Sequence, residues 1–431
     1  MYIGHDTFPG GDDHREFINI LQCINRNGKT INIKLHNMKR RTFFRSGIAG
    51  AAGITMIGNS AFAGSVRADE GEIVYRTLGR TGLRVPVVSF GVMRSDNSSL
   101  VRAAWDGGMK MFDTAHGYMN GRNEEMLGGF FSTVPRESFF VATKVKPAGV
   151  DSRTGLPSRE TTSEDFLQKF DLSLKRLRID YVDILYMHSA ESVEMVRHKE
   201  IVKTMLDLKK QGKVRFIGIS THKNEPLVIN TMVEDGIWDV VLTSYNYRQT
   251  YLDEMNSAIE KAAAAGMGIV AMKTMAGGWL DRERTKPVNA QAALRWVISN
   301  PGVHTTIPGI TAFDQLETDL KVMRDIVLTD QDKSELVAEA GLPGLYCNAC
   351  SKCVPGCPNN LPIPELMRAY MYAYGYRNAG MASELLSQTA AGADPCSGCS
   401  GCSATCVRGF DLREKISDIS RLVNVPYDLI A

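Results

Sequence analysis

The chain has 431 residues, a length typical of two to three domains. Apolar residues make up 44% and charged residues 23%, a composition that excludes disorder of the whole chain. The formal net charge is +2, so the chain as a whole has no strong positive charge that would attract nucleic acid. No run of 18 uninterrupted apolar residues is present, so no ordinary membrane-spanning helix is expected. One of the nine cysteines is Cys23 and the other eight lie between residues 347 and 406, a clustering that indicates a metal site.

The N-terminal region has the layout of a targeting signal. Residues 1–37 are polar without clear periodicity, and we interpret them as an extension without function or an over-long gene model, with Met38 as the true start. Residues 38–63 combine paired arginines (40–41), a mildly apolar Gly/Ala-rich middle and an A-x-A cleavage form (61–63). This pattern resembles a twin-arginine signal, the alternative being a basic linker. It predicts export to the periplasm by the twin-arginine machinery, with no stable membrane span after cleavage.

Eight short β-rich runs alternate with amphipathic helical patterns in the middle of the chain. Each run is apolar on both faces, which is typical of a parallel strand buried on both sides. Eight such units over about 250 residues predict an α/β fold, a closed (β/α)₈ barrel at 72–328. An open doubly wound sheet is disfavoured because the expected Gly-x-Gly-x-x-Gly is absent after the first strand. The expected strands are 87–91, 109–113, 139–144, 182–188, 214–220, 239–244, 268–273 and 304–308.

Ionisable residues lie where the second, third and fourth expected strands end. These are Asp113, Lys144 and His188, and Tyr118 follows Asp113 by five residues. The C-terminal strand ends of such a barrel converge on one mouth. Carbonyl reduction needs a hydride on carbon and a proton on oxygen, and a tyrosine needs a neighbouring cation to give its proton near neutrality. Each residue alone could be structural: Asp113 and Lys144 as an ion pair, His188 as a core histidine and Tyr118 as an aromatic side chain at the barrel rim. The four together favour a catalytic role.

Five segments of this region carry motifs in a fixed order: 78–86 (LGRTGLRVP), 112–118 (FDTAHGY), 123–128 (NEEMLG), 142–144 (ATK) and 185–188 (LYMH). Together they resemble the aldo-keto reductase family over roughly residues 72–325. The resemblance implies nicotinamide-dependent reduction of a small carbonyl substrate or oxidation of an alcohol. It also implies that Tyr118 is the acid, tuned by Lys144 and Asp113, with His188 orienting the carbonyl oxygen.

The resemblance further implies a site for NAD(H) or NADP(H) on the later strand ends. Ser220 and Thr221 stand where the family holds the nicotinamide amide with a Ser-Asn pair. Lys273 and Gly277 belong to a segment that resembles the loop under the pyrophosphate, and Gly309 belongs to a loop before a helix N-terminus. Basic side chains that would hold an adenosine 2′-phosphate are not evident after this loop, so the sequence does not indicate a preference for NADP.

The C-terminal cysteines form two runs with the same spacing, C-x₂-C-x₂-C-x₃-C. This spacing is the bacterial ferredoxin signature, in which the fourth cysteine of each run binds the other cluster. It predicts a ferredoxin-like α+β domain at 340–431 with two 4Fe-4S clusters, the alternatives being zinc ribbons and disulfides. The expected ligand sets are Cys347, Cys350, Cys353 and Cys406 for one cluster and Cys396, Cys399, Cys402 and Cys357 for the other.

Taken together, these features predict an exported iron–sulfur oxidoreductase of the aldo-keto reductase type. It would act on a carbonyl or alcohol with a bound nicotinamide, while its clusters exchange electrons with a redox protein partner. The alternative is an exported electron-transfer protein whose barrel is a non-catalytic scaffold or docking surface. No nucleic-acid partner is expected in either case.

Overall fold

The computed structural model describes residues 20–24, 30–34, 71–389 and 391–430. The chain divides into two compact units, Met1–Val66 and Arg67–Ala431. The described residues of the first unit form an antiparallel pair, β1 (Ile20–Ile24) and β2 (Thr30–Lys34), which the sequence did not predict. The signal predicted at 38–63 lies outside the described residues.

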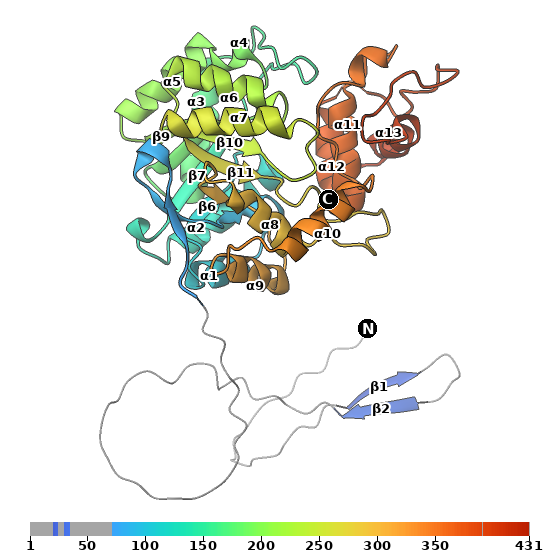
Figure 1. Cartoon of the computed structure of the whole chain (residues 1–431), viewed down its shortest axis with the longest axis horizontal. Helices are drawn as coiled ribbons and strands as arrows, with labels where there is room; N and C mark the ends of the chain where they lie inside the picture. The colour runs from blue at the N-terminus through green and yellow to red at the C-terminus, as the bar shows by residue number, and fades with distance from the viewer. Residues whose placement is uncertain (1–19, 25–29, 35–70, 390, 431) are drawn as a thin grey trace, which may run out of the picture. The chain divides into compact units, whose positions relative to one another are not determined.

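Eight parallel strands form the central sheet of the second unit, and each strand pairs with the next along the chain (Figure 1). Parallel bridges from Val88 to Thr306 and from Gly91 to Gly309 join the first strand to the last, so the sheet closes on itself. The predicted (β/α)₈ barrel is confirmed. The strands are β5 (Phe90–Gly91), β6 (Met111–Asp113), β7 (Phe140–Val145), β8 (Val182–Met187), β9 (Val214–Thr221), β10 (Val240–Ser244), β11 (Gly268–Met272) and β12 (Thr305–Thr306).

Helices between the strands cover the outside of the sheet with one apolar face each (Figure 1). Burial of this continuous apolar layer supplies the main driving force for closing the barrel. The covering helices are α1 (Ser98–Asp106), α2 (Arg122–Phe131), α3 (Ser163–Leu177), α4 (Val193–Val196), α5 (Lys199–Lys210), α6 (Glu225–Asp235), α7 (Leu252–Ala264), α8 (Ala290–Ser299) and α9 (Phe313–Val322).

The base of the barrel is closed by a short hairpin of β3 (Tyr75–Thr77) and β4 (Arg84–Pro86). Leu78, between these strands, is completely buried in the interior cluster of the barrel. It packs so closely on Gly268 that a Cβ there would lie 2.8 Å from its Cγ. Since the base is filled, the opposite end, where the strands have their C-terminal ends, is where chemistry can take place.

The C-terminal part of the chain is helical in the residues that the structure describes. Its elements are α10 (Asp330–Ala340), α11 (Ile363–Tyr370), a π-helical turn (Met371–Gly375), α12 (Ala379–Ser387) and α13 (Leu412–Ser420). Among described residues after β12 no strand is found, whereas the sequence predicted an α+β domain. The physical reason is that the segment between the cysteine runs has apolar residues at helical spacing, which form a core with α12 and α13.

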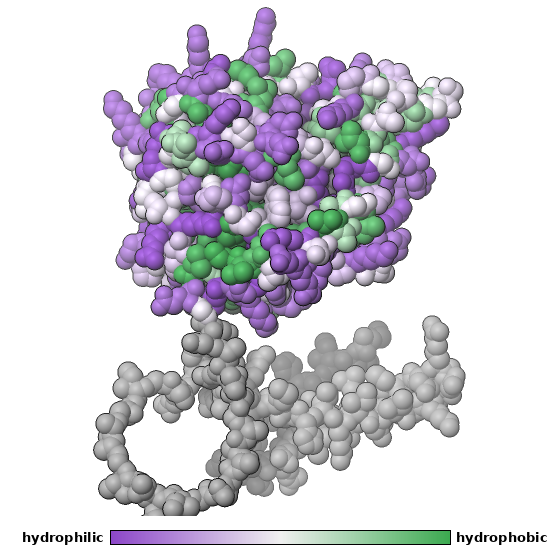
Figure 2. All heavy atoms as spheres, in the orientation of Figure 1, coloured by the Kyte–Doolittle hydropathy of each residue, from purple (hydrophilic) through white to green (hydrophobic). Residues whose placement is uncertain are grey.

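The C-terminal helices pack beside the barrel and share an apolar core with it (Figure 1). Ala276, in the loop after β11, is completely buried in that core together with Tyr346 and Met371. On the face in Figure 2, hydrophilic residues predominate, and hydrophobic ones gather in a few patches between them. Within the described part of the chain, no helix combines the length and apolarity needed to cross a membrane.

Candidate functional site

Four ionisable side chains predicted from the sequence meet at the mouth of the barrel. Asp113 ends β6, Lys144 is the next-to-last residue of β7, and His188 follows β8 directly. Tyr118 begins a short 3₁₀ turn in the loop after β6. Parallel pairing brings the ends of these three neighbouring strands to one edge, and this explains why residues far apart in sequence meet there.

Lys144 is the centre of this group. Its Nζ donates hydrogen bonds to the Asp113 carboxylate, to the Thr114 carbonyl oxygen at 2.7 Å and to Tyr118 Oη at 3.2 Å. An ammonium group has three N–H donors, so each of them has a partner. Lys144 is 1% exposed and Asp113 is 2% exposed. The position of the ammonium group beside the phenol is therefore fixed.

The charges at the mouth leave Tyr118 as a neutral phenol beside a cation. Burial lowers the pKa of Lys144, but Asp113 and Tyr118 together outweigh burial and raise that pKa above its ordinary value. Burial raises the pKa of Tyr118 above 10.0, and Lys144 opposes this shift. Burial, and then the Lys144 charge, hold the pKa of His188 well below 6.5, so its imidazole is neutral. The rings of His188 and Tyr118 are perpendicular, with centroids 5.9 Å apart.

A buried network supports the loop that carries Tyr118. Asn123 accepts a hydrogen bond from Thr114 Oγ1 at 2.6 Å and donates to the carbonyl oxygens of Val92 and Ser95 at 2.7 and 2.8 Å. It therefore joins the loop after β6 to the loop after β5. The sequence singled out the motif at 123–128 without giving it a role, and this network is the role that the structure shows.

The residues predicted to bind a nicotinamide cofactor lie along the later strand ends. Ser220 and Thr221 end β9 and are buried. Lys273 follows β11, and burial lowers its pKa to about 7. Gly277 is buried against the C-terminal helices, whereas Gly309 is exposed. Of these five residues, only Gly309 is exposed.

Sequence reasoning missed side chains that the C-terminal helices bring to the mouth. Nη1 of Arg368, on α11, lies 2.7 Å from Nδ1 and 2.9 Å from Nε2 of His222, which follows β9. Gln388 accepts a hydrogen bond from Lys146 at 2.8 Å. Tyr372 is among the groups that raise the pKa of Tyr118. The spacing of residues 368, 372 and 376, one helical turn apart, was the signal that could have indicated a shared face.

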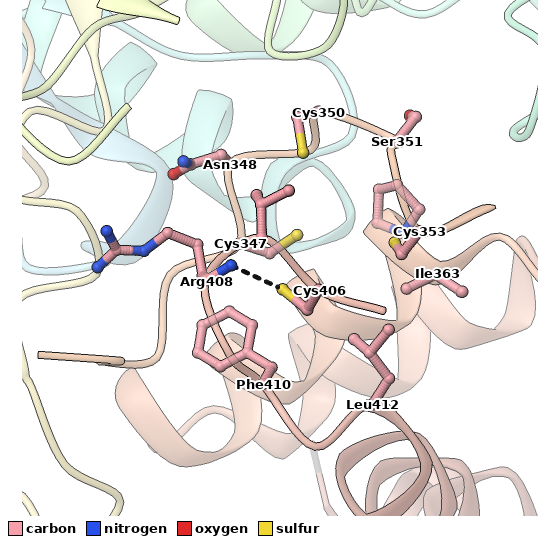
Figure 3. A pocket seen from close by; sticks show the side chains of 12 residues that line it. Cys347, Asn348, Cys350, Ser351, Cys353, Ile363, Cys406, Arg408, Phe410 and Leu412 are labelled. Atoms are coloured by element: carbon pink, nitrogen blue, oxygen red, sulfur yellow. Dashed lines mark hydrogen bonds between the residues drawn. The ribbon is translucent and has the colours of Figure 1, made fainter. Parts of the chain in front are cut away.

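The eight C-terminal cysteines line two cavities, four to each. All eight are free thiols rather than disulfides. Figure 3 shows the first cavity, with Arg408 N–H donating to Cys406 Sγ at 3.4 Å. Among the described residues, no three His, Cys, Asp or Glu side chains are close enough to hold a single metal ion. The first cavity is lined by Cys347, Cys350, Cys353 and Cys406, and the second by Cys357, Cys396, Cys399 and Cys402.

The donor chemistry of both cavities fits an iron–sulfur cluster. Four cysteine sulfur atoms from two chain segments surround each space, and apolar side chains such as Phe410 and Leu412 line the first. Backbone N–H groups also donate to sulfur, as from Ala349 to Cys347 at 3.4 Å. Thiolate ligands, hydrogen bonds to sulfur and limited solvent access are the features that hold and tune such clusters.

Comparisons with known proteins agree with both parts of the site. Residues 89–291 match the model of the aldo/keto reductase family, and residues 346–411 match a 4Fe-4S dicluster domain. L-galactose dehydrogenase from Arabidopsis thaliana is 28% identical over 312 residues, covering 62% of this chain and 92% of that protein. A probable voltage-gated potassium channel subunit beta from Oryza sativa subsp. japonica is 25% identical over 323 residues, covering 62% and 97%.

Solved structures support the barrel fold. An aldo-keto reductase from Bacillus halodurans, in its holo form, covers 65% of this chain and 98% of its own, with 20% identity and a TM-score of 0.51. At this identity the likeness concerns the fold. The catalytic interpretation depends on the side chains at the mouth of this barrel.

Proposed function

We propose that the protein is an iron–sulfur oxidoreductase that interconverts a carbonyl and an alcohol at the barrel mouth. The match to an aldo/keto reductase model and to a 4Fe-4S dicluster domain in one chain supports this proposal. The observation that carries this proposal is the hydrogen bond from Lys144 to Tyr118, with Lys144 held by Asp113 and His188 beside the phenol. Electrons would pass between the substrate and a redox protein partner by way of the C-terminal domain.

In the direction of reduction, Tyr118 gives its phenolic proton to the substrate oxygen. The Lys144 ammonium group stabilises the phenolate that remains, because an adjacent opposite charge favours the ionised form. Asp113 holds Lys144 in place, and the neutral His188 donates a ring N–H to the substrate oxygen as charge develops on it. Oxidation of an alcohol uses the same groups in reverse, with the phenolate as base.

The two cysteine quartets would hold the clusters that supply one-electron transfer. Cys347, Cys350, Cys353 and Cys406 would bind one, and Cys357, Cys396, Cys399 and Cys402 the other. A carbonyl takes up two electrons and two protons to become an alcohol. Two single-electron centres in one domain match the number of electrons that the reaction requires.

The pH dependence of turnover tests the proposal. Carbonyl reduction driven by reduced methyl viologen should be nearly constant from about pH 7 to about pH 9, because the acid stays protonated below its pKa. The pKa of Tyr118 lies above 10.0 and that of His188 well below 6.5, so neither group titrates in this range. Alcohol oxidation should instead rise with pH, since it needs the phenolate. The pKa of Lys273 is about 7, so a reduction rate that titrates near neutrality would contradict the assignment of Tyr118 if the same titration persists in Lys273→Met.

The electron-transfer alternative has one specific observation in its favour. Arg368 and Tyr372 of the C-terminal part lie against the barrel mouth. If the barrel is a scaffold, the clusters would exchange electrons with viologen while no carbonyl or alcohol in a broad panel is converted. Turnover of any one substrate in that panel would instead support the enzyme.

We also propose that residues 38–63 direct export to the periplasm by the twin-arginine route. The paired arginines support this proposal, since that route reads them as an address. A reporter protein fused behind residues 1–66 should reach the periplasm, and replacing Arg40 and Arg41 together by lysine should leave it in the cytoplasm. Lys39→Gln is the matched control, because it removes a neighbouring positive charge and keeps the pair. Equal export of all three fusions would contradict the proposal.

A further inference from the structure

The C-terminal helices cover the part of the barrel mouth where the family resemblance places a nicotinamide dinucleotide. We infer that this domain closes the dinucleotide groove, so that free NAD(H) and NADP(H) do not bind there. Reducing equivalents then reach the mouth through the cluster domain alone. Contacts at three separate points along the expected groove carry this inference.

The first point is the loop after β11 that would lie under a pyrophosphate. A Cβ placed on Gly277 would lie 3.4 Å from Met371 Sδ and 3.7 Å from Tyr346 Cβ. These are ordinary packing distances, so protein atoms already occupy the space above the glycine. The neighbouring Ala276 is completely buried in the C-terminal apolar core. The space directly above Gly277 is therefore filled by the C-terminal segment, whereas a Cβ on Gly278 would have no atom within 4 Å.

The second point lies between the loops that follow the first and last strands. Gly91 and Gly309 are joined there by a parallel bridge. The Arg94 side chain passes over Gly309, with its Cδ 3.6 Å from where a Cβ would be. Its guanidinium lies 4.1 Å from the centroid of the Tyr376 ring. This stacked pair joins the loop after β5 to the C-terminal segment, beside the exposed Gly309.

The third point is the end of β9, where the nicotinamide amide was expected. Ser220 Oγ accepts a hydrogen bond from Ser189 N–H at 3.1 Å, and Thr221 Oγ1 donates to the Lys223 carbonyl oxygen at 2.8 Å. The Thr221 hydroxyl proton is therefore engaged within the protein, and the Ser220 oxygen holds the Ser189 N–H. The adjacent His222 lies against Arg368 of α11. No side-chain amide stands beside Ser220 to replace these partners.

The cover is attached firmly to the barrel. Tyr251 Oη donates to the Asn348 carbonyl oxygen at 2.9 Å, and Asn348 Nδ2 donates to the Arg248 carbonyl oxygen at 3.1 Å. Arg248 Nη2 in turn donates to the Pro343 carbonyl oxygen at 2.9 Å. These bonds join the segment before and within the first cysteine run to the loop after β10. Lifting the C-terminal segment away from the barrel would break this set of polar contacts, which is costly.

The same contacts place a cysteine run beside the mouth. Tyr346, which covers Gly277, is followed directly by Cys347. If the proposed function holds, on which this step rests, a carbonyl becomes an alcohol by gaining two electrons, one proton on its oxygen from Tyr118 and one proton on its carbon from solvent water. The electrons then come from two molecules of a reduced one-electron carrier, each of which is oxidised once.

Binding measurements on the holoprotein test the inference without depending on turnover. Titration of anaerobic holoprotein with NADH or NADPH should give no saturable heat up to about 1 mM, a range that includes ordinary cofactor affinities. Amide exchange of residues 273–278 should not change on addition of either nucleotide. Saturable binding with protection of that loop would overturn the inference, as would a stoichiometric nucleotide in an acid extract of the purified protein.

A pair of variants tests whether the C-terminal segment is the cover. Met371→Ala should speed amide exchange in residues 273–278, whereas Met381→Ala, on α12, should leave it as in the parent. Equal exchange in the two variants would overturn the inference. Carbonyl turnover with reduced viologen in nucleotide-free protein supports it, and turnover that requires added NADH or NADPH opposes it. If no carbonyl is turned over with any electron donor, the proposed function is wrong. The titration with NADH and NADPH still decides whether the dinucleotide groove is closed.

Discussion

Replacing Tyr118 by phenylalanine should lower carbonyl turnover by about 10²–10⁴-fold, the usual contribution of a positioned acid. The substitution removes the hydroxyl that Lys144 contacts at 3.2 Å and keeps the ring that packs perpendicular to His188. The loss should appear in kcat, because the proton moves in the transition state. Viologen-driven turnover measures it, and electron paramagnetic resonance of the reduced clusters should be the same as in the parent.

Tyr186→Phe is the matched control for this variant. Tyr186 lies in β8 inside the barrel, is completely buried, and its hydroxyl has no hydrogen-bond partner. Removing an unpaired buried hydroxyl is expected to be neutral or slightly stabilising, so turnover should stay close to that of the parent. Full turnover in Tyr118→Phe would remove Tyr118 as the acid, and equal losses in both variants would indicate a general disturbance of the barrel.

The barrel and the four residues at its mouth could be predicted because their signals are local. Each strand is a short apolar run, and a polar residue stands at or directly after the end of several of them, as Asp113 does in β6 and His188 after β8. Barrel geometry then places these ends together without any knowledge of individual contacts. The strand lengths were less predictable: the last strand is Thr305–Thr306, shorter than the expected 304–308, since pairing with two neighbours sets its length.

The position of the C-terminal helices could not be predicted, because it depends on contacts between distant residues. Arg368 and His222 are 146 positions apart, and neither has a local pattern that names the other. Tyr372 and Tyr376 likewise lie against the barrel mouth, where no sequence motif places them. The sequence showed that Thr221 replaces the asparagine of the family's Ser-Asn pair. Only the tertiary structure shows that the C-terminal helices lie beside this strand end.

Replacing Cys357 by alanine should remove the cluster held by the second cysteine run rather than that of its own run. Cys357 lines the cavity formed with Cys396, Cys399 and Cys402, although it follows Cys353 by four residues. Loss of one thiolate ligand should halve the iron content, from about eight to about four atoms per chain. Iron analysis and electron paramagnetic resonance of the dithionite-reduced protein measure the change.

The electron paramagnetic resonance signal that remains in each variant shows which cysteines bind the same cluster. Cys357→Ala and Cys402→Ala should leave the same remaining signal, and Cys406→Ala, which removes a ligand of the first cavity, should leave the other. Ser351→Ala is the control, because Ser351 lines the first cavity without offering a thiolate and should keep all the iron. A remaining signal in Cys357→Ala that matches Cys406→Ala would assign each run to its own cluster. The prediction that the fourth cysteine of each run binds the cluster of the other run would then be wrong. Each cluster would instead be held by a single chain segment.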